Sequence, residues 1–289
     1  MNTIAVKENL IQRKAGGLSS FSIKVLALAL MTLDHIYYYL GGTVLEIPFI
    51  FTLLGRISAP LFIFAMAEGF VHTHDRKAYL KRLYIAAVLM SLGNFLVNKY
   101  LPHPGGAMVV NGMFATLFLV GLYIWGIEFF IKGIKTRQKK LMIKAGFMLG
   151  IPMMSGAALI ILMDSPLILG IPGQILFNAL FMLFPSPVLV EGSIFWVALG
   201  LGFYFLRNHK GWLAAFYSLM SGFFFISALE GGLSLTNIFL LNNQWFMIFA
   251  LIFILLYNGE KGRKMKYAFY IYYPLHVYLL VLLARLIMP

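Results

Sequence analysis

Ionisable side chains stand inside segments of this sequence that are otherwise apolar. Asp34 and His35 share one apolar run, Arg56 lies in the next, and His276 follows Pro274 near the carboxyl end. Such groups are expensive to place in hydrocarbon, so they usually face an interior cavity and mark a function. A histidine with an orienting carboxylate can act as a general base toward an amine or hydroxyl. The alternatives are a structural ion pair for Asp34 and Arg56, and for His276 a ring satisfied by a backbone carbonyl near the proline.

A second polar set lies where the Arg56-containing run ends and a cationic segment begins. Lys and Arg side chains bind phosphate, so this segment predicts a site for a phosphate-bearing donor. The alternatives are that the cations fix topology and contact lipid, and that the acid and histidine simply end a helix at the interface. The candidate donor-binding residues are Glu68, His72, Arg76, Lys77, Lys81 and Arg82.

The composition indicates a membrane protein. The 289 residues are 61% hydrophobic and 11% charged, with a mean hydropathy of +0.86, whereas soluble domains are about 25% charged. The net charge of +13 fits cytoplasmic loops beside anionic lipid, and we expect no nucleic-acid partner. The absence of cysteine excludes thiol catalysis, disulfides and cysteine-ligated metals. His74 and Asp75 lack further ligands at a suitable spacing, so we expect no metal.

The apolar runs predict an all-α, polytopic fold with nine to ten transmembrane helices. A stretch at 163–190 is also apolar but is cut by Pro166, Pro172, Pro185 and Pro187, which predicts a re-entrant or outer-face element. The nine expected crossings are 21–40, 48–71, 80–98, 112–131, 142–162, 191–206, 212–230, 244–257 and 267–287.

Most Lys and Arg residues fall in five clusters, and short basic loops stay in the cytoplasm. Nine crossings keep all five clusters on that side, with the N-terminus inside and the C-terminus outside. Ten crossings remain the alternative, with 163–190 as a full span. The expected organisation is a cytosolic basic segment, 1–20, and one transmembrane domain, 21–289.

Depth arithmetic brings Asp34 and Arg56 together. At about 1.5 Å per residue, Asp34 lies roughly 20 Å along the first helix and Arg56 about 12 Å along the returning one, so the two reach a similar level. Adjacent residues on a helix diverge by about 100°, so Asp34 cannot easily stack on His35. We therefore expect Asp34 to pair with Arg56 or to reach His276.

Three segments together resemble the TraX family of bacterial membrane proteins. They are KVLALALMTLDHI, LGRISAPLFIFAMAEGFVHTHDRKAYLKRL and KYAFYIYYPLHVYLL. The resemblance covers roughly residues 20–100 and 265–280, and only hydropathy matches in between. The family pattern has Arg-Asn after His-Thr, where this chain has His74-Asp75.

The resemblance implies an acyltransferase of the bacterial cytoplasmic (inner) membrane. The family's namesake acetylates the N-terminus of a pilin subunit, and acetyl-CoA is the implied donor. The acceptor stays open between a peptide N-terminus, a glycan and a lipid-linked molecule, and lipids are the other partners.

Two other functions fit the same residues. Asp34, Arg56, Glu68 and His276 could instead form a proton relay or substrate path in a proton-coupled transporter or flippase. A non-catalytic membrane scaffold is a third alternative.

Overall fold

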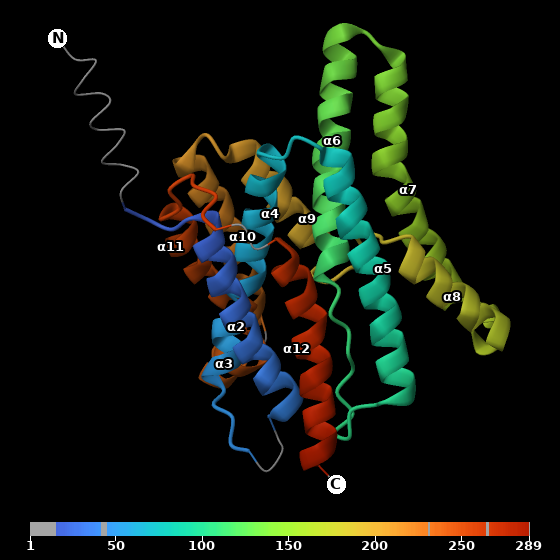
Figure 1. Cartoon of the computed structure of the whole chain (residues 1–289), viewed down its shortest axis with the longest axis vertical. Coiled ribbons are helices and arrows are strands. Elements are labelled where there is room, and N and C mark those ends of the chain that lie inside the picture. The colour runs from blue at the N-terminus through green and yellow to red at the C-terminus, as the bar shows by residue number, and fades with distance from the viewer. Residues whose placement is uncertain (1–15, 42–44, 231, 264–265, 289) are drawn as a thin grey trace. The chain divides into compact units, whose positions relative to one another are not determined.

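The computed structural model describes residues 16–41, 45–230, 232–263 and 266–288. All named elements in these ranges are helices (Figure 1), which confirms the all-α class. Most of the basic segment 1–20 lies outside the described residues. The elements are α2 (Ser20–Leu40), α3 (Ile50–Gly55), α4 (Ser58–Val71), α5 (Arg76–Tyr100), α6 (Met113–Thr136), α7 (Lys139–Met163), η1 (Pro166–Leu169), α8 (Ile171–Leu183), α9 (Ser193–Leu206), α10 (Lys210–Glu230), η2 (Thr236–Leu241), η3 (Asn243–Phe249), α11 (Ala250–Leu255) and α12 (Lys266–Ile287).

Among the described residues, seven helices are long and apolar enough to cross a membrane, so the chain has the character of a multi-pass membrane protein. Each coincides with a run expected from the sequence. They are Ser20–Leu40, Ile50–Val71, Arg76–Tyr100, Met113–Thr136, Lys139–Met163, Lys210–Glu230 and Tyr267–Ile287.

The two remaining expected crossings are helical but short. Helix α9 has 14 residues, which span about 21 Å and fall short of a hydrocarbon core of about 30 Å. Helix α9 cannot begin earlier, because the backbone is left-handed at Gly192 and Ser193, with φ of 73° and 50°. A Cβ at Gly192 would also overlap the ring of Trp196. The other short crossing is the 13-residue stretch of η3 and α11.

Prolines break the 163–190 stretch at the positions where a helix tolerates them. Pro166 begins η1, and Pro172 stands in the first turn of α8, where its missing N–H has no intrahelical partner to lose. Pro185 and Pro187 follow the end of α8. The stretch therefore forms two short helices in place of one long one.

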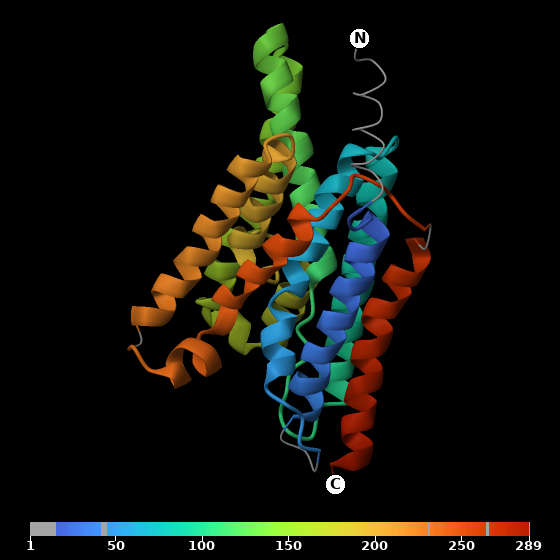
Figure 2. The ribbon, with the colours of Figure 1, turned by 90° about the vertical axis from the view of Figure 1, so that its left-hand side faces the viewer.

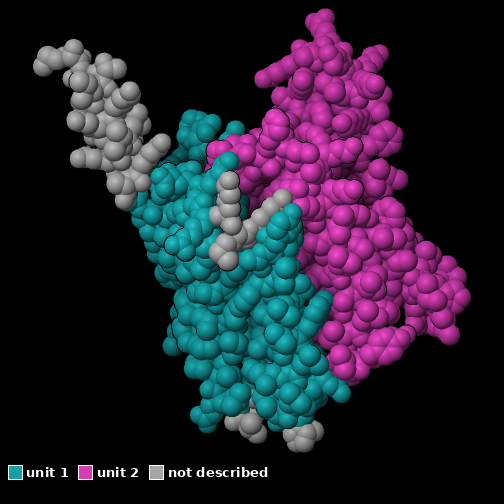
Figure 3. Space-filling model, viewed as in Figure 1, with its two compact units in different colours: residues 1–65, 103–107, 206–289 teal, residues 66–102, 108–205 magenta. Residues whose placement is uncertain are grey.

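The chain divides into two compact units (Figure 3). Unit 1 comprises residues 1–65, 103–107 and 206–289, and unit 2 comprises 66–102 and 108–205. The division falls inside α4, between Ala65 and Met66, so this helix contributes to both units.

In unit 1, α2 and α12 run side by side in the same direction (Figures 1 and 2). Backbone bonds fix this arrangement at the start of α2. Ser20 donates its N–H to the carbonyl of Glu260 at 2.8 Å, and Leu18 donates to Leu256 at 2.8 Å. The segment that leads into α12 is thereby tied to the N-terminus of α2, and both helices begin at the same end of the unit.

Helices α3 and α4 form one span that is interrupted at Arg56. Pro60 has no N–H for the carbonyl of Arg56, four residues earlier, and its ring crowds that carbonyl. The chain tightens here: Arg56 and Ile57 donate to Leu53 and Leu54, three residues back, at 3.2 Å each. Sequence thus places an arginine at a break in a membrane helix.

Unit 2 contains α5 to α9, and α6 and α7 form a long antiparallel hairpin (Figure 1). Their connection turns at Arg137, whose φ is 54°. Helix α5 packs on α6. Gly121 of α6 permits this approach, because a Cβ there would lie 2.6 Å from the Leu80 side chain.

Candidate functional site

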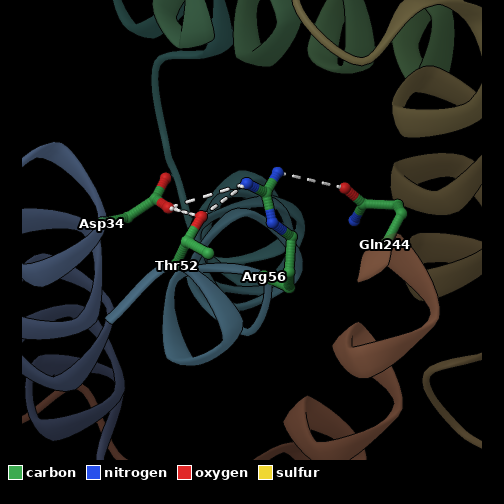
Figure 4. A network of polar contacts seen from close by, with 4 residues as sticks. All are labelled: Asp34, Thr52, Arg56 and Gln244. Carbon is green, nitrogen blue, oxygen red and sulfur yellow. Dashed lines mark hydrogen bonds and ion pairs between the residues drawn. The ribbon is translucent and has the colours of Figure 1, made fainter. Parts of the chain in front are cut away.

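A polar network in unit 1 joins α2, the α3–α4 span and η3 (Figure 4). Arg56 Nη2 lies 3.6 Å from Asp34 Oδ1, which confirms the expected pairing of these residues. Thr52 mediates most of the interaction between Asp34 and Arg56. Its Oγ1 donates to Asp34 Oδ1 at 2.7 Å and accepts from Arg56 Nη2 at 2.9 Å. Arg56 Nη1 points to Gln244 Oε1 at 3.5 Å. The contact between the two charges is therefore mainly indirect.

Arg56 keeps donors that the described residues do not satisfy. Its Nε is buried and has no hydrogen-bond partner, and the bond to Gln244 is at the upper limit of length. A buried donor without a partner is costly, so this guanidinium is suited to a ligand oxygen. Gly55 allows the helices to meet here, because a Cβ would lie 2.3 Å from the Cβ of Asp34.

A buried histidine pair joins α2 to α12. His35 Nδ1 lies 2.7 Å from His276 Nε2, and the two rings stack with centroids 5.0 Å apart. Both side chains are buried, and His276 Nδ1 lies 2.8 Å from the carbonyl oxygen of Tyr272. Asp34 and His35 thus face different helices, as their divergence on α2 predicts.

The hydrogen bonds assign the tautomers of the neutral pair. A carbonyl oxygen only accepts, so His276 Nδ1 must carry a proton and donate it to Tyr272. In neutral His276 the Nε2 is then the acceptor, and His35 Nδ1 donates to it. Neutral His35 therefore carries its lone pair on Nε2, the tautomer of a base whose other nitrogen is anchored.

Tyr272 and Thr32, which the sequence analysis did not select, hold this pair in register. Thr32 Oγ1 donates to the Leu28 carbonyl at 2.8 Å and lies 2.7 Å from Tyr272 Oη, so the tyrosine hydroxyl donates to it. The Tyr272 ring also stacks on His276 at 4.9 Å. The i,i+4 spacing of Tyr272 and His276 was the available signal, because it places both side chains on one face of a helix.

In unit 2, Arg76 is held in a closed polar triad. Its Nη1 donates to Glu128 Oε2, and its Nη2 donates to Tyr204 Oη at 2.9 Å. Tyr204 Oη in turn donates to Glu128 Oε1 at 2.5 Å. The guanidinium also lies over the Phe70 ring, 4.7 Å from its centroid. Sequence reasoning missed Glu128 and Tyr204, which lie 52 and 128 residues from Arg76.

The other donor candidates are spread along the end of α4 and the start of α5. Glu68 Oε2 lies 3.8 Å from His72 Nε2, one helical turn away. Lys77 and Lys81 are exposed. The Arg82 guanidinium lies over the Tyr79 ring at 5.9 Å, and its Nε is buried without a partner.

Asp75, which lies between His72 and Arg76, has a structural role. Asp75 caps α5 by accepting the N–H of Ala78 at 2.9 Å, which accounts for the carboxylate beside His74. In the described parts of the chain, no three His, Asp or Glu side chains gather as a metal site requires.

The two predicted sets fall into different units. Asp34, His35, Arg56 and His276 all belong to unit 1, and the six donor candidates from Glu68 to Arg82 all belong to unit 2. The structure thus groups the base and arginine candidates in one compact body and the phosphate-binding candidates in the other.

The fold and these buried polar groups define a polytopic helical membrane protein with ionisable residues inside its spans. The chain belongs to the TraX family, because the family model described as TraX protein matches residues 19–284. Comparisons with curated proteins and with solved structures gave no match.

Proposed function

We propose that the protein is an integral-membrane acetyltransferase that uses cytosolic acetyl-CoA. The acceptor would be an amine or hydroxyl of a membrane-associated or exported molecule: a peptide N-terminus, a glycan or a lipid-linked compound. Family membership supports this class. The observation that carries the proposal is the chain from His35 through His276 to the Tyr272 carbonyl, because it prepares one nitrogen of a buried histidine as a base.

In the proposed reaction, His35 Nε2 removes a proton from the acceptor nitrogen or oxygen as that atom attacks the thioester carbonyl carbon. The new C–N or C–O bond forms a tetrahedral intermediate with a negative oxygen. The C–S bond then breaks, and the proton on His35 passes to the departing thiolate. His276 is a positioning residue, since it holds His35 Nδ1 and so keeps the lone pair on Nε2.

Arg56 is the proposed donor to the oxyanion. Its Nε lacks a partner and its Nη1 is only weakly engaged, so a developing negative oxygen would gain bonds that the resting site does not supply. Asp34 and Thr52 hold the remaining nitrogen of the guanidinium, Nη2, in place. The phosphates of the donor are assigned to the cationic start of α5.

For the orientation, we propose the cytoplasmic membrane with a cytosolic N-terminus and nine crossings, in which α9 and the η3–α11 stretch also cross. Short helices cross where the bilayer thins locally or neighbouring helices cover their ends. The basic α6–α7 turn, with Lys135, Arg137, Lys139 and Lys140, would then be cytosolic. Reporter fusions after residues 140 and 210 should both indicate cytoplasm, and an external signal at 210 would restore the ten-crossing alternative.

The test of the reaction uses the purified full chain in detergent, labelled acetyl-CoA and an extract of bacterial membranes as the source of acceptor. His35→Ala should lower transfer by about 10²–10⁴-fold, the range of a general base, and should leave coenzyme A binding intact. His209→Ala is the matched control, since this histidine is exposed at the start of α10. Near-normal transfer by His35→Ala would refute the assignment, and label retained on the protein would indicate an acyl-enzyme in place of direct transfer.

The hydrogen-bonded histidines also suit proton relay, so a proton-coupled transporter or flippase is the second candidate. Liposomes that contain the protein distinguish the two functions. Substrate flux that follows a proton gradient, without acetyl-CoA turnover, would favour transport. Turnover of acetyl-CoA that is independent of the gradient would favour the transferase.

A further inference from the structure

A shallow hollow in unit 2 has the lining of a nucleotide site. It lies where α5 begins beside α6, has a volume of about 420 Å³, and is lined by His74, Asp75, Arg76, Lys77 and Trp125. This volume falls in the range of small-molecule sites, about 300–1,000 Å³. It combines an aromatic ring with cations, the two features that recognise a base and its phosphates.

Trp125 is the aromatic component, and its neighbours hold it in place. Its ring stacks on Phe129 with centroids 5.3 Å apart and an interplanar angle of 29°. The Nζ of Lys144, from the facing helix α7, lies 5.5 Å from the Trp125 centroid and 4.1 Å from that of Phe129. A tryptophan fixed on a helix is a platform on which a planar base can stack at little cost in side-chain order.

The charge available to a ligand comes from Lys77 and Lys144. Both are exposed, and neither forms an ion pair within the described part of the chain. The charge of Arg76 is instead engaged by Glu128 and Tyr204. Asp75, the acid in the lining, uses one carboxylate oxygen to cap α5. The two lysines are therefore free to contact phosphate.

We infer that this hollow binds the nucleotide end of the acyl donor, with the purine stacked on Trp125 and the phosphates on Lys77 and Lys144. The inference rests on the proposed function, which supplies a donor that carries adenosine and phosphates. It differs from the expectation based on sequence alone, because Lys81 and Arg82 do not line the hollow, whereas Trp125 of α6 does. Lys144 of α7 is not a lining residue, but its Nζ lies 5.5 Å from the centroid of the Trp125 ring.

Binding is measured first, because it needs no turnover. Calorimetry on the full chain in detergent should give a Kd for coenzyme A and for adenosine 3′,5′-bisphosphate. Trp125→Ala should weaken both about tenfold or more, while Trp125→Phe should keep most of the affinity. Lys77→Ala and Lys144→Ala should each weaken binding about tenfold, with a smaller effect at high salt. Trp212→Ala and Lys139→Ala are the matched controls, since both residues are exposed and lie outside the hollow.

Turnover separates this inference from the proposed function. Acetyl-pantetheine carries the thioester but no nucleotide. Trp125→Ala should therefore raise KM for acetyl-CoA and leave KM for acetyl-pantetheine unchanged, whereas His35→Ala should abolish the use of both. If Trp125→Ala alters neither Kd nor KM, or if Lys81→Ala weakens binding and Lys77→Ala does not, the inference is overturned while the transferase stands. Weakened binding in a protein that transfers no acetyl group would uphold the nucleotide site and refute the transferase.

Discussion

An arginine–carboxylate pair is found in each unit of this protein, and these two pairs are built differently. In unit 2, Arg76 contacts Glu128 directly and Tyr204 closes the triad by bonding both partners. In unit 1, Arg56 lies 3.6 Å from Asp34, with Thr52 between them. Exposure does not separate the pairs, since the side chains are 24% and 32% exposed for Arg76 and Glu128 and 32% and 23% for Arg56 and Asp34.

The difference lies in how completely each guanidinium is satisfied. Arg76 has two bonds from its terminal nitrogens and an aromatic ring beneath it. Arg56 has a long bond at one terminal nitrogen and a buried Nε without a partner. A closed polar triad stabilises the fold, whereas a guanidinium with an unpaired donor can bind a ligand oxygen. We therefore propose a structural role for Arg76 and a functional one for Arg56.

The largest expected effect comes from opening the closed triad. Glu128→Ala removes acceptors for both Arg76 and Tyr204, and charge-assisted hydrogen bonds contribute about 1.5–3 kcal/mol each. The free energy of unfolding should fall by about 3 kcal/mol, measured from the unfolding midpoint in detergent. Glu260→Ala, at an exposed loop position, is the control. An unchanged midpoint would mean that the triad does not stabilise unit 2.

Substitution of Arg56, in the Asp34–Arg56 pair, should lower the activity of the protein and leave its stability nearly unchanged. Arg56→Met should lower acetyl transfer by about 10²–10³-fold, the loss typical of a missing oxyanion donor, with a change in unfolding free energy of about 1 kcal/mol or less. Arg56→Lys should recover only part of the activity, because an ammonium lacks the fork of a guanidinium. Arg263→Met, in an exposed loop, is the control. Transfer within about threefold of wild type would show that Arg56 does not contact the reacting group.

The smallest effect should come from Asp34, the carboxylate of the Asp34–Arg56 pair. Asp34→Asn keeps an acceptor for Thr52 and removes a charge that lies beyond direct hydrogen-bond distance of Arg56. Its cost to stability should be about 1 kcal/mol. Double-mutant cycles of Asp34→Asn with Arg56→Met, and of Glu128→Ala with Arg76→Met, measure both couplings. A coupling for Asp34–Arg56 as large as that for Glu128–Arg76 would remove the distinction between the pairs.

Local rules predicted part of the candidate site well. Helical rise placed Asp34 and Arg56 at one level, and the divergence of neighbouring residues sent Asp34 and His35 to different helices. Both results follow from the geometry of a single helix and a short connection. The all-α class and the seven long spans likewise follow from the length of the apolar runs.

Pairings between distant helices could not be predicted in this way. His35 and His276 were both selected, yet their contact depends on the tie between the start of α2 and the segment before α12. Arg76 was assigned to phosphate as a member of a cationic segment, and its contacts with Glu128 and Tyr204 were missed because these residues lie 52 and 128 positions further along the chain. Trp125 was not selected from the sequence, and only the packing of α7 against α6 places Lys144 near its ring. Composition also could not show that α9 begins at Ser193, which the left-handed backbone at Gly192 decides.

The histidine pair also sets an order of events during biosynthesis. Its two members are 241 residues apart, so α12 leaves the ribosome long after α2. Helix α2 therefore enters the membrane long before the residue that fixes the tautomer of His35 has been made. A chain synthesised only as far as α11 contains Asp34, Thr52 and Arg56 without the anchored base, so it acquires its proposed chemistry only when α12 inserts.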